Sequence, residues 1–252
     1  MIFFDHTFPS PPENLACDEA LLDWAESGAG HESLRFWESP APFVVVGYAN
    51  QVATEVNVMA CEQRKIAVLR RCSGGGTVVQ GPGCLNYALV LPIDQAGPLH
   101  SIARANQFIM RRNRAAIESA IRGSRSTAPI SVSGHTDLAF VTRHASRVSQ
   151  KKFSGNSQRR RKHFLLFHGT FLLNFDLTLI SELLPMPSKQ PHYRESRSHA
   201  DFLMNLNASA DEIKTALRKT WSADAPLTNP PLDAIQTLAR EKYSTNEWNF
   251  KF

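Results

Sequence analysis

The spacing of apolar residues predicts several helices along this chain of 252 residues. Residues 12–26 carry an apolar stripe at helical spacing, and the acidic residues Asp18, Glu19 and Asp23 fall outside it. The longest helix is expected at residues 102–121, with Ile102 in its apolar stripe and its arginines facing outward. Shorter helices are expected at residues 52–65, from the capping box Ser209–Glu212 to Trp221, and at residues 232–242.

Short runs of β-branched and aromatic residues predict strands that gather in the middle of the chain. They lie at residues 33–37, 43–46, 66–70, 85–91, 137–142 and 164–175, with a polar loop expected at 123–129. Helices stand between and after these strands without regular βαβ alternation, so the pattern favours an α+β fold with a mixed sheet flanked by helices. We expect a single domain over residues 1–252, of which about 207–252 form a helical C-terminal tail.

Composition and charge narrow the class of protein. The net charge is +5, and basic residues cluster in two runs, Arg111–Arg114 and Arg159–Lys162. Aromatic residues do not interleave with these runs, so the charge favours a solvated basic face, or one that meets an acidic protein partner, over nucleic acid. The N-terminus has no secretory signal pattern, and no apolar run reaches the length of about 20 residues that a membrane span requires. Four scattered cysteines without C-x-x-C spacing predict neither a zinc site nor a disulfide framework, so we expect a reduced, cytoplasmic protein with no membrane partner.

The stretch from Leu69 to Pro92 holds the strongest candidate chemistry. Three consecutive glycines, Gly74–Gly76, allow backbone N–H groups to approach a ligand closely and to form a concave anion site. The preceding Arg70 and Arg71 are donors able to grip a carboxylate or a phosphate. We therefore expect a hairpin whose mobile turn closes over a negatively charged ligand, although the glycines alone fit a plain hairpin turn equally well. Neither a P-loop nor a G-x-G-x-x-G motif occurs in the chain.

A second candidate stretch begins near Lys151. Lys152 stands three residues before Gly155, and an apolar strand farther on contains His168-Gly169-Thr170. A lysine is a compact cation that can lie between a carboxylate and a phosphate and stabilise the charge that develops during adenylation. Asp137, at the start of a strand, is a candidate Mg²⁺ contact beside phosphates. Taken singly, these residues also fit an exposed turn lysine, a satisfied core histidine and a turn aspartate.

These residues resemble the lipoate–protein ligase A family, within the wider group of biotin and lipoyl protein ligases. The resemblance is collinear over nearly the whole chain. It rests on NLACDEALL at 14–22, LRFWESPAPFVVVGYANQVATEVN at 34–57, RRCSGGGTV at 70–78, KFSGNSQRRRKHFLLFHGTFLL at 152–173, RESRSHADFLMNL at 194–206 and YSTNEWNF at 243–250. It implies one catalytic domain with a mixed sheet and a bifurcated pocket, one arm for an eight-carbon acyl chain and the other for ATP. Without a further C-terminal domain, the chain is similar to the short ligases that rely on a separate accessory protein.

The resemblance also implies an activity. Lipoic or octanoic acid would attack the α-phosphate of ATP, with Mg²⁺, to give an acyl-AMP, and a lysine of an acceptor protein would then take the acyl group. Acceptors in that family are lipoyl domains of 2-oxoacid dehydrogenase complexes and the glycine cleavage H protein. By position, Lys152 would be the essential lysine and Asp137 the metal contact. The acyl-adenylate would be bordered by Arg70, Arg71, Ser73, Gly74, Gly75, Gly76, Thr77, Val78, Asn86, Gly155, His168, Gly169 and Thr170.

Departures from the family keep other functions open. Gly81–Cys84 replaces a D-x-G-N pattern, and Cys72 stands where a small residue is usual. Octanoyl or lipoyl transferases of the same superfamily carry the acyl group on a cysteine, and the segment 127–138, where that cysteine is expected, contains none. A ligase is therefore favoured over a transferase, with a non-catalytic acyl- or nucleotide-binding relative as a further alternative. A biotin ligase is disfavoured, because this chain resembles the loop of those enzymes only in its glycines. A nucleic-acid binder is a more distant alternative, and its affinity for an oligonucleotide would fall steeply with salt concentration.

Overall fold

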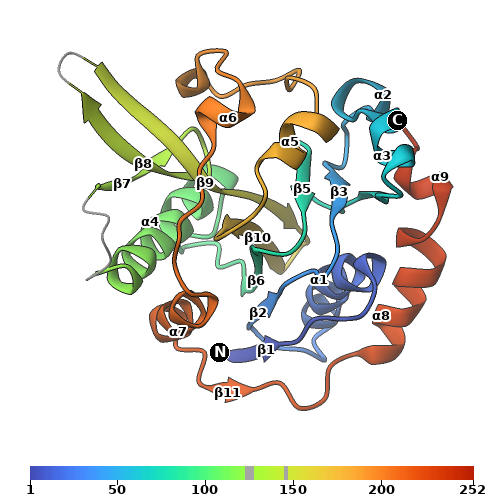
Figure 1. Cartoon of the computed structure of the whole chain (residues 1–252). Coiled ribbons are helices and arrows are strands. Elements are labelled where there is room, and N and C mark those ends of the chain that lie inside the picture. The colour runs from blue at the N-terminus through green and yellow to red at the C-terminus, as the bar shows by residue number, and fades with distance from the viewer. Residues whose placement is uncertain (123–127, 145–146) are drawn as a thin grey trace.

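The computed structural model describes residues 1–122, 128–144 and 147–252, and its strands form two sheets (Figure 1). The strands are β1 Ile2–Asp5, β2 Ser33–Trp37, β3 Phe43–Val46, β4 Val68–Arg70, β5 Val78–Gln80, β6 Cys84–Pro92, β7 Ile130–Ser133, β8 Asp137–His144, β9 Arg147–Arg160, β10 Phe164–Leu172 and β11 Ala225–Pro226. Within the described residues, the larger sheet has eight strands in the order β11-β1-β2-β6-β10-β9-β8-β7, parallel among β11, β1 and β2 and antiparallel elsewhere. The smaller sheet has the order β4-β3-β5.

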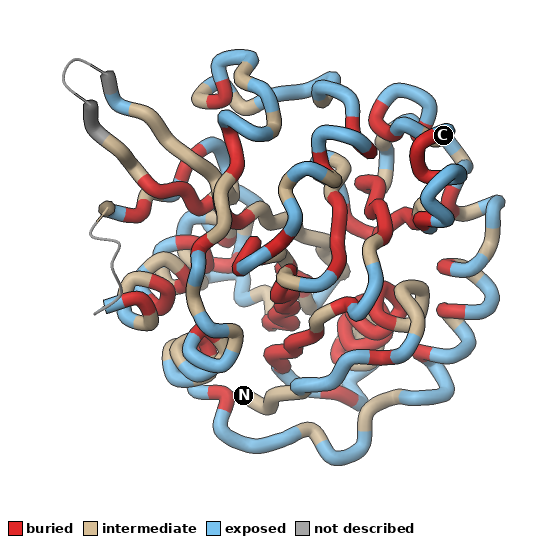
Figure 2. The backbone as a smooth tube through the Cα atoms, viewed as in Figure 1, coloured by how far each residue is buried: buried red, intermediate tan, exposed pale blue. Residues whose placement is uncertain are grey.

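Helices cover both faces of the larger sheet (Figure 1). They are α1 Pro11–Glu26, α2 Val52–Glu55, α3 Val58–Gln63, α4 Ile102–Ala120, α5 Thr178–Leu183, α6 His199–Phe202, α7 Ala210–Trp221, α8 Leu232–Leu238 and α9 Asn246–Asn249, with a 3₁₀ turn at His192–Arg194 and a π-helical turn at Ala239–Tyr243. One hydrophobic cluster joins α4 and α7 to one face of the larger sheet, and a second joins α1 and α8 to the other face. Figure 2 shows the buried backbone concentrated in the central strands and in α1. No helix among the described residues is long and apolar enough to cross a membrane.

The predicted α+β architecture, a mixed sheet flanked by helices, is confirmed. The strands predicted at residues 33–37 and 43–46 match β2 and β3 residue for residue. The helix predicted at 52–65 is instead two short helices, because the side chain of Asn57 caps a new helix by accepting from Ala60 N. The predicted polar loop at 123–129 lies largely outside the described residues. The single domain over residues 1–252 stays a prediction.

The glycine loop, residues 71–77, is not the turn of a hairpin, which corrects the sequence-based expectation. Its flanking strands β4 and β5 do not pair with each other but lie on opposite edges of β3, parallel and antiparallel to it respectively. Residues Phe43–Val46 of β3 are all buried, and an apolar strand of this kind is most stable between two neighbours. The loop therefore crosses the end of β3 and faces the larger sheet.

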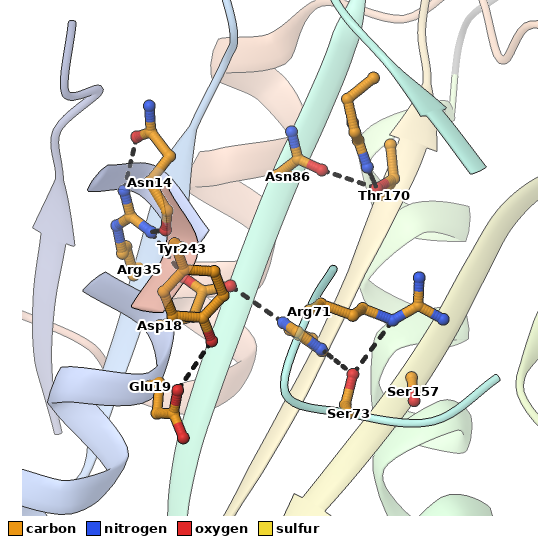
Figure 3. A network of polar contacts seen from close by, with 12 residues as sticks. Asn14, Asp18, Glu19, Arg35, Arg71, Ser73, Asn86, Ser157, Thr170 and Tyr243 are labelled. Carbon is orange, nitrogen blue, oxygen red and sulfur yellow. Dashed lines mark hydrogen bonds and ion pairs between the residues drawn. The ribbon is translucent and has the colours of Figure 1, made fainter. Parts of the chain in front are cut away.

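Two acidic residues of α1 point inward, although the apolar spacing placed them outside the buried face. Asp18 and Glu19 are 2% and 4% exposed. Asp18 pairs with Arg35 of β2, and Glu19 accepts from the hydroxyl of Tyr243 (Figure 3). A buried carboxylate is tolerated where charged and hydrogen-bonding partners meet it, and these partners come from distant parts of the sequence.

The positions of α4 and of the basic runs also differ from expectation. Ile102 is 59% exposed and does not join the apolar stripe of α4. Arg112 does not face outward, because its guanidinium lies 4.7 Å from the ring centroid of Trp221. In the second basic run, Arg161 pairs with two carboxylates of α1, and Arg160 donates to the carbonyls of residues 99 and 100. Both runs therefore contribute partly to internal contacts.

Candidate active site

A cavity of about 580 Å³ lies where the smaller sheet, the glycine loop and the segment 184–203 meet one face of the larger sheet. Most residues predicted to form the site line this cavity. They are Arg71, Gly75, Gly76, Thr77, Val78, Asn86, Asp137, Lys152, Gly155, His168, Gly169 and Thr170. Apolar side chains such as Leu15, Val45 and Phe202 line much of the rest. Arg70 and Ser73 do not line the cavity, and neither does Gly74.

The pairing of β6, β10 and β9 explains why residues far apart in the sequence meet here. Asn86 on β6 pairs with Thr170 on β10, and Thr170 pairs with Gly155 on β9. His168 precedes Thr170 by two residues and therefore points to the same face of the sheet. Thr170 Oγ1 donates to Asn86 Oδ1 at 2.6 Å (Figure 3) and accepts from Gln80 Nε2 at 2.6 Å. One face of three neighbouring strands thus forms a floor of the cavity.

A β-bulge in β9 turns Lys152 toward the cavity. Leu138 pairs with Ser154 and Ala139 pairs with Lys152, so Phe153 is an extra residue on β9. A bulge of this kind breaks the strict alternation of a strand and re-aims a side chain. Phe153 is fully buried in the core, while Lys152 lines the cavity.

The ammonium group of Lys152 is held in place by a carboxylate. Lys152 Nζ lies 2.8 Å from Asp137 Oδ1, and the hydroxyl of Tyr193 donates to Asp137 Oδ2 at 2.7 Å. A Cβ at Gly155 would lie 2.8 Å from Lys152 Nζ, so glycine at this position leaves room for the ammonium group. Lys152 is therefore a fixed cation at the wall of the cavity, where it can stabilise negative charge on a reacting group.

The carbonyl groups of the glycine loop are turned toward the protein. Arg71 donates to the carbonyls of Gly74 and Gly76 at 2.5 and 2.7 Å, and Asn50 donates to the carbonyl between them at 3.1 Å. Because a trans peptide is planar, its N–H points opposite to its C=O. The N–H groups of residues 75–77 thus face away from these donors, and within the described residues they have no hydrogen-bond partner. Gly75, Gly76 and Thr77 line the cavity, and anion binding by their N–H groups stays a prediction.

Both arginines before the loop bind backbone groups. Arg70 does not line the cavity, which corrects the expectation that it grips a ligand directly, whereas a ligand contact of Arg71 stays a prediction. Adjacent strand residues point to opposite faces, so Arg71 turns to the loop while Arg70 turns to the C-terminal segment. Burial lowers the pKa of Arg71 to about 10. Arg70 is fully buried away from the cavity. Its guanidinium donates to the carbonyls of Gly47, Tyr48, Asn50, Trp248 and Asn249.

A chain of buried polar groups ties the loop to the larger sheet (Figure 3). His168 Nε2 lies 2.6 Å from Ser73 Oγ, His168 Nδ1 lies 2.9 Å from Asp18 Oδ2, and Asp18 Oδ1 accepts from Arg35 Nη1 at 2.6 Å. Burial alone would raise the pKa of Asp18, but the Arg35 charge and the contacts from His168 outweigh it and hold that pKa below its ordinary value. Ser73 is 1% exposed and accepts from Arg71 Nε at 3.1 Å. The serine therefore anchors the loop and is not presented to the cavity as a nucleophile.

Sequence reasoning missed Asp18 as part of this site. The available signal was Arg35, which lies in the middle of a strand that is buried at every position. A fully buried arginine needs acceptors, and an acidic residue on the preceding helix is the nearest candidate in the sequence. Asn14 supplies two further acceptors for Arg35, because its backbone and side-chain oxygens accept from the guanidinium at 2.7 and 2.8 Å.

Comparison with known proteins identifies the family. Residues 10–222 match the lipoyl protein ligase A/B catalytic domain. The chain belongs to this family. Two curated members similar to it are octanoyltransferases LipM, from Halalkalibacterium halodurans (24% identical, covering 99% of this chain and 98% of that protein) and Carboxydothermus hydrogenoformans (28% identical, covering 99% and 98%). The resemblance to the lipoyl protein ligases is thereby confirmed.

Solved structures agree with the family assignment. One is a bipartite lipoate protein ligase from Thermoplasma acidophilum, described with its E2 lipoyl domain, with a TM-score of 0.78, 25% identity and coverage of 99% of this chain and 95% of that one. Another is a lipoate-protein ligase A bound with ATP, with a TM-score of 0.72, 25% identity and coverage of 99% and 98%. The lipoyl protein ligase fold therefore extends over nearly all of this chain.

None of the four cysteines lines the cavity. Cys17, Cys61, Cys72 and Cys84 are all buried and free. Burial raises the pKa of Cys17, Cys72 and Cys84 to about 12. Since the thiolate is the nucleophilic form, these thiols are poorly suited to carry an acyl group.

Asp137 is placed as the partner of Lys152 and not as an open metal ligand. Both of its carboxylate oxygens have partners, Lys152 and Tyr193. Within the described residues there is no group of three or more His, Cys, Asp or Glu side chains that could hold a metal ion. These donors do not fit a Mg²⁺ ion held by protein side chains alone, and the Mg²⁺ contact of Asp137 stays a prediction.

Proposed function

We propose that the protein attaches an eight-carbon acyl group, octanoyl or lipoyl, to a lysine of an acceptor protein. The observation that carries the proposal is the position of Lys152, fixed by Asp137 at the wall of a partly apolar cavity beside the free N–H groups of the glycine loop. The octanoyltransferase names of the curated relatives support this chemistry. The E2 lipoyl domain described with the Thermoplasma ligase supports a lipoyl domain of a 2-oxoacid dehydrogenase complex, or the similar glycine cleavage H protein, as acceptor.

The reaction joins the amine of the acceptor lysine to the acyl carbon and expels the group that activated the acyl chain. Negative charge develops on the acyl oxygen and on the leaving group. We assign the stabilisation of that charge to Lys152 and the N–H groups of residues 75–77. A fixed donor of this kind is worth about 10²–10³-fold in rate. No nucleophile from this chain is required, because the acceptor supplies the amine.

The names of the relatives favour a transferase over an ATP-dependent ligase. In that case the acyl donor is a thioester on a carrier protein. Because the cysteines are buried away from the cavity, we infer that the acyl group passes directly from the donor thiol to the acceptor amine. The thiol leaves with the proton that the attacking amine gives up, so no ATP is consumed.

The second candidate is the adenylating ligase, and the same cysteine placement favours it. A ligase activates the free acid as an acyl-AMP and needs no cysteine at any step. Two solved ligases at 25% identity, one of them bound with ATP, support this alternative. The need for an accessory protein, and the choice between lipoic and octanoic acid, belong to the same proposal.

One experiment separates these candidates. Purified protein is incubated with an apo lipoyl domain and either octanoyl-carrier protein without ATP, or octanoic acid with ATP and Mg²⁺, and the mass of the acceptor is measured. Acylation in the first mixture alone identifies a transferase, and acylation with pyrophosphate release in the second identifies a ligase. Lys152→Ala should lower the rate of acylation in either mixture by about 10²-fold or more. Tight acyl binding with no acylation in either mixture would contradict the proposal and indicate a non-catalytic binding relative.

A further inference from the structure

Asn156 connects two parts of the candidate site through reciprocal hydrogen bonds. It follows Gly155 on β9 and lines the cavity. Asn156 Nδ2 donates to the carbonyl of Thr136 at 2.6 Å, and Thr136 Oγ1 donates to the carbonyl of Asn156 at 2.7 Å. Thr136 directly precedes Asp137, the residue that holds Lys152. Two hydrogen bonds to Asn156, together with the ion pair between Asp137 and Lys152, therefore attach the turn that carries Asp137 to β9.

The orientation of this amide is fixed from the hydrophobic core. Trp221 Nε1, which can only donate, donates to Asn113 Oδ1 at 2.9 Å, so Asn113 Nδ2 must face the hydroxyl of Tyr87, at 2.8 Å. The Tyr87 hydroxyl thus accepts a hydrogen bond from Asn113 and donates one to Asn156 Oδ1, at 2.6 Å. Burial raises the pKa of Tyr87, so the hydroxyl keeps its proton. Because Trp221 can only donate, Asn156 Nδ2 faces the carbonyl of Thr136, with a longer contact of 3.4 Å to Ser154 Oγ.

A glycine on the neighbouring strand makes room for the amide. A Cβ at Gly169 would lie 1.7 Å from Asn156 Oδ1 and 2.7 Å from the carbonyl oxygen of Gly155. Real Cβ atoms do not approach so closely, and the amide is held at both ends. The contact with Asn156 therefore explains why position 169 is a glycine.

We propose that Asn156 is a positioning residue for acyl transfer, which holds the Thr136–Asp137 turn so that Asp137 keeps Lys152 directed into the cavity. This inference rests on the proposed function, because it assigns Lys152 a part in the reaction. Asn156 acts through Asp137 and makes no contact with the reacting atoms. Its substitution should lower the rate of the chemical step and leave the binding of the acyl donor almost unchanged.

The test compares Asn156→Ala with a matched variant, Asn205→Ala, in the acceptor acylation assay. Asn205 also makes two backbone hydrogen bonds through its amide, to Phe175, but it does not line the cavity. We expect Asn156→Ala to lower kcat by about 10- to 100-fold, the order of loss that a small misplacement of a catalytic group causes, with KM for the donor within about twofold. Asn205→Ala should keep kcat within about twofold.

A double-mutant cycle with Asp137→Ala tests the route of the effect. If Asn156 acts through Asp137, then Asn156→Ala causes no further loss of kcat in the Asp137→Ala background. A loss of the same factor in both backgrounds, or a kcat within about twofold of wild type in the single variant, would overturn the inference.

Hydrogen–deuterium exchange gives a readout that does not depend on activity. Peptides covering residues 134–138 should exchange faster in Asn156→Ala than in wild type or in Asn205→Ala. Unchanged exchange there would refute the positioning role even in an active enzyme. If wild-type protein acylates nothing while this exchange rises as expected, the proposed function fails and the attachment of the turn by Asn156 stands.

Discussion

Replacing Arg35 by methionine should destabilise the fold by several kcal/mol, because it leaves the carboxylate of Asp18 buried without its cation. Arg35 is 0% exposed, and Asp18 is 2% exposed. Breaking a buried ion pair by removing one partner costs about 3–5 kcal/mol. For a chain of this size, each kcal/mol lowers Tm by about 2–4 °C, so Arg35→Met should lower Tm by about 6–20 °C. Methionine fills much of the space of the arginine stem, so the loss reports mainly the charge and its hydrogen bonds.

The matched control is Arg64→Met, which removes an exposed ion pair with Glu182. The two side chains are 49% and 39% exposed, and such a pair contributes less than about 1 kcal/mol. Thermal unfolding followed by circular dichroism gives both Tm values at neutral pH. If the two variants unfold within about 3 °C of each other, the argument from burial is wrong.

The ion pair between Arg35 and Asp18 also predicts how the stability of the fold depends on pH. The folded-state pKa of Asp18 lies below its ordinary value of 3.8, so ionised Asp18 adds stability above that pH. This contribution is lost as the pH falls below 3.8 toward the folded-state pKa. The stability gap between wild type and Arg35→Met should therefore be full near neutral pH and shrink in acid. A gap that widens in acid would contradict the assignment of the charge to Asp18.

Three further predictions follow from the site. Lys152→Ala should lower kcat for acceptor acylation by about 10²-fold or more while the protein stays folded, since one preorganised donor is lost; unchanged kcat would remove Lys152 from the mechanism. Arg70→Met should speed deuterium exchange in residues 246–252, because the carbonyls of α9 lose a buried donor; unchanged exchange would show that α9 is held by other contacts. Cys72→Ala and Cys84→Ala should keep kcat within about threefold, and a loss of a hundredfold with an intact fold would reveal a cysteine relay.

Local patterns in the sequence were sufficient for much of the fold. The apolar run of β3 predicted that strand residue for residue, since buried strands are marked by continuous β-branched and aromatic residues. The bounds of β2 were also predicted, although Ser33 and Arg35 interrupt its apolar residues. The start of α1 is likewise local, because Ser10 and Glu13 form a capping box. Such elements are predictable because the residues that stabilise them are neighbours in the chain.

The elements that were missed depend on distant partners. β9 was not predicted because residues 151–160 are mostly polar and show no alternation of apolar and polar residues. Their partners are distant in the sequence: several of these residues line the cavity, and Gln158 donates to Asn106 of α4. The inward turn of Asp18 depends on Arg35 and His168, which are 17 and 150 residues away. Most of the predicted site residues do line the cavity, but their spacing did not reveal that Arg70 and Arg71 serve the backbone.

The two arginines also shape the chemistry of the cavity through their charge. Within the described residues, neither guanidinium forms an ion pair with a carboxylate, and both are satisfied by neutral oxygens. Their charges are therefore not cancelled locally, and in a buried environment of low dielectric constant they raise the potential around the glycine loop. Because the loop carbonyls are tied down, its free N–H groups need no rearrangement to meet negative charge. The reaction is favoured with either acyl donor. A thioester and an acyl-AMP both develop negative charge on the acyl oxygen and on the leaving group as the amine attacks the acyl carbon.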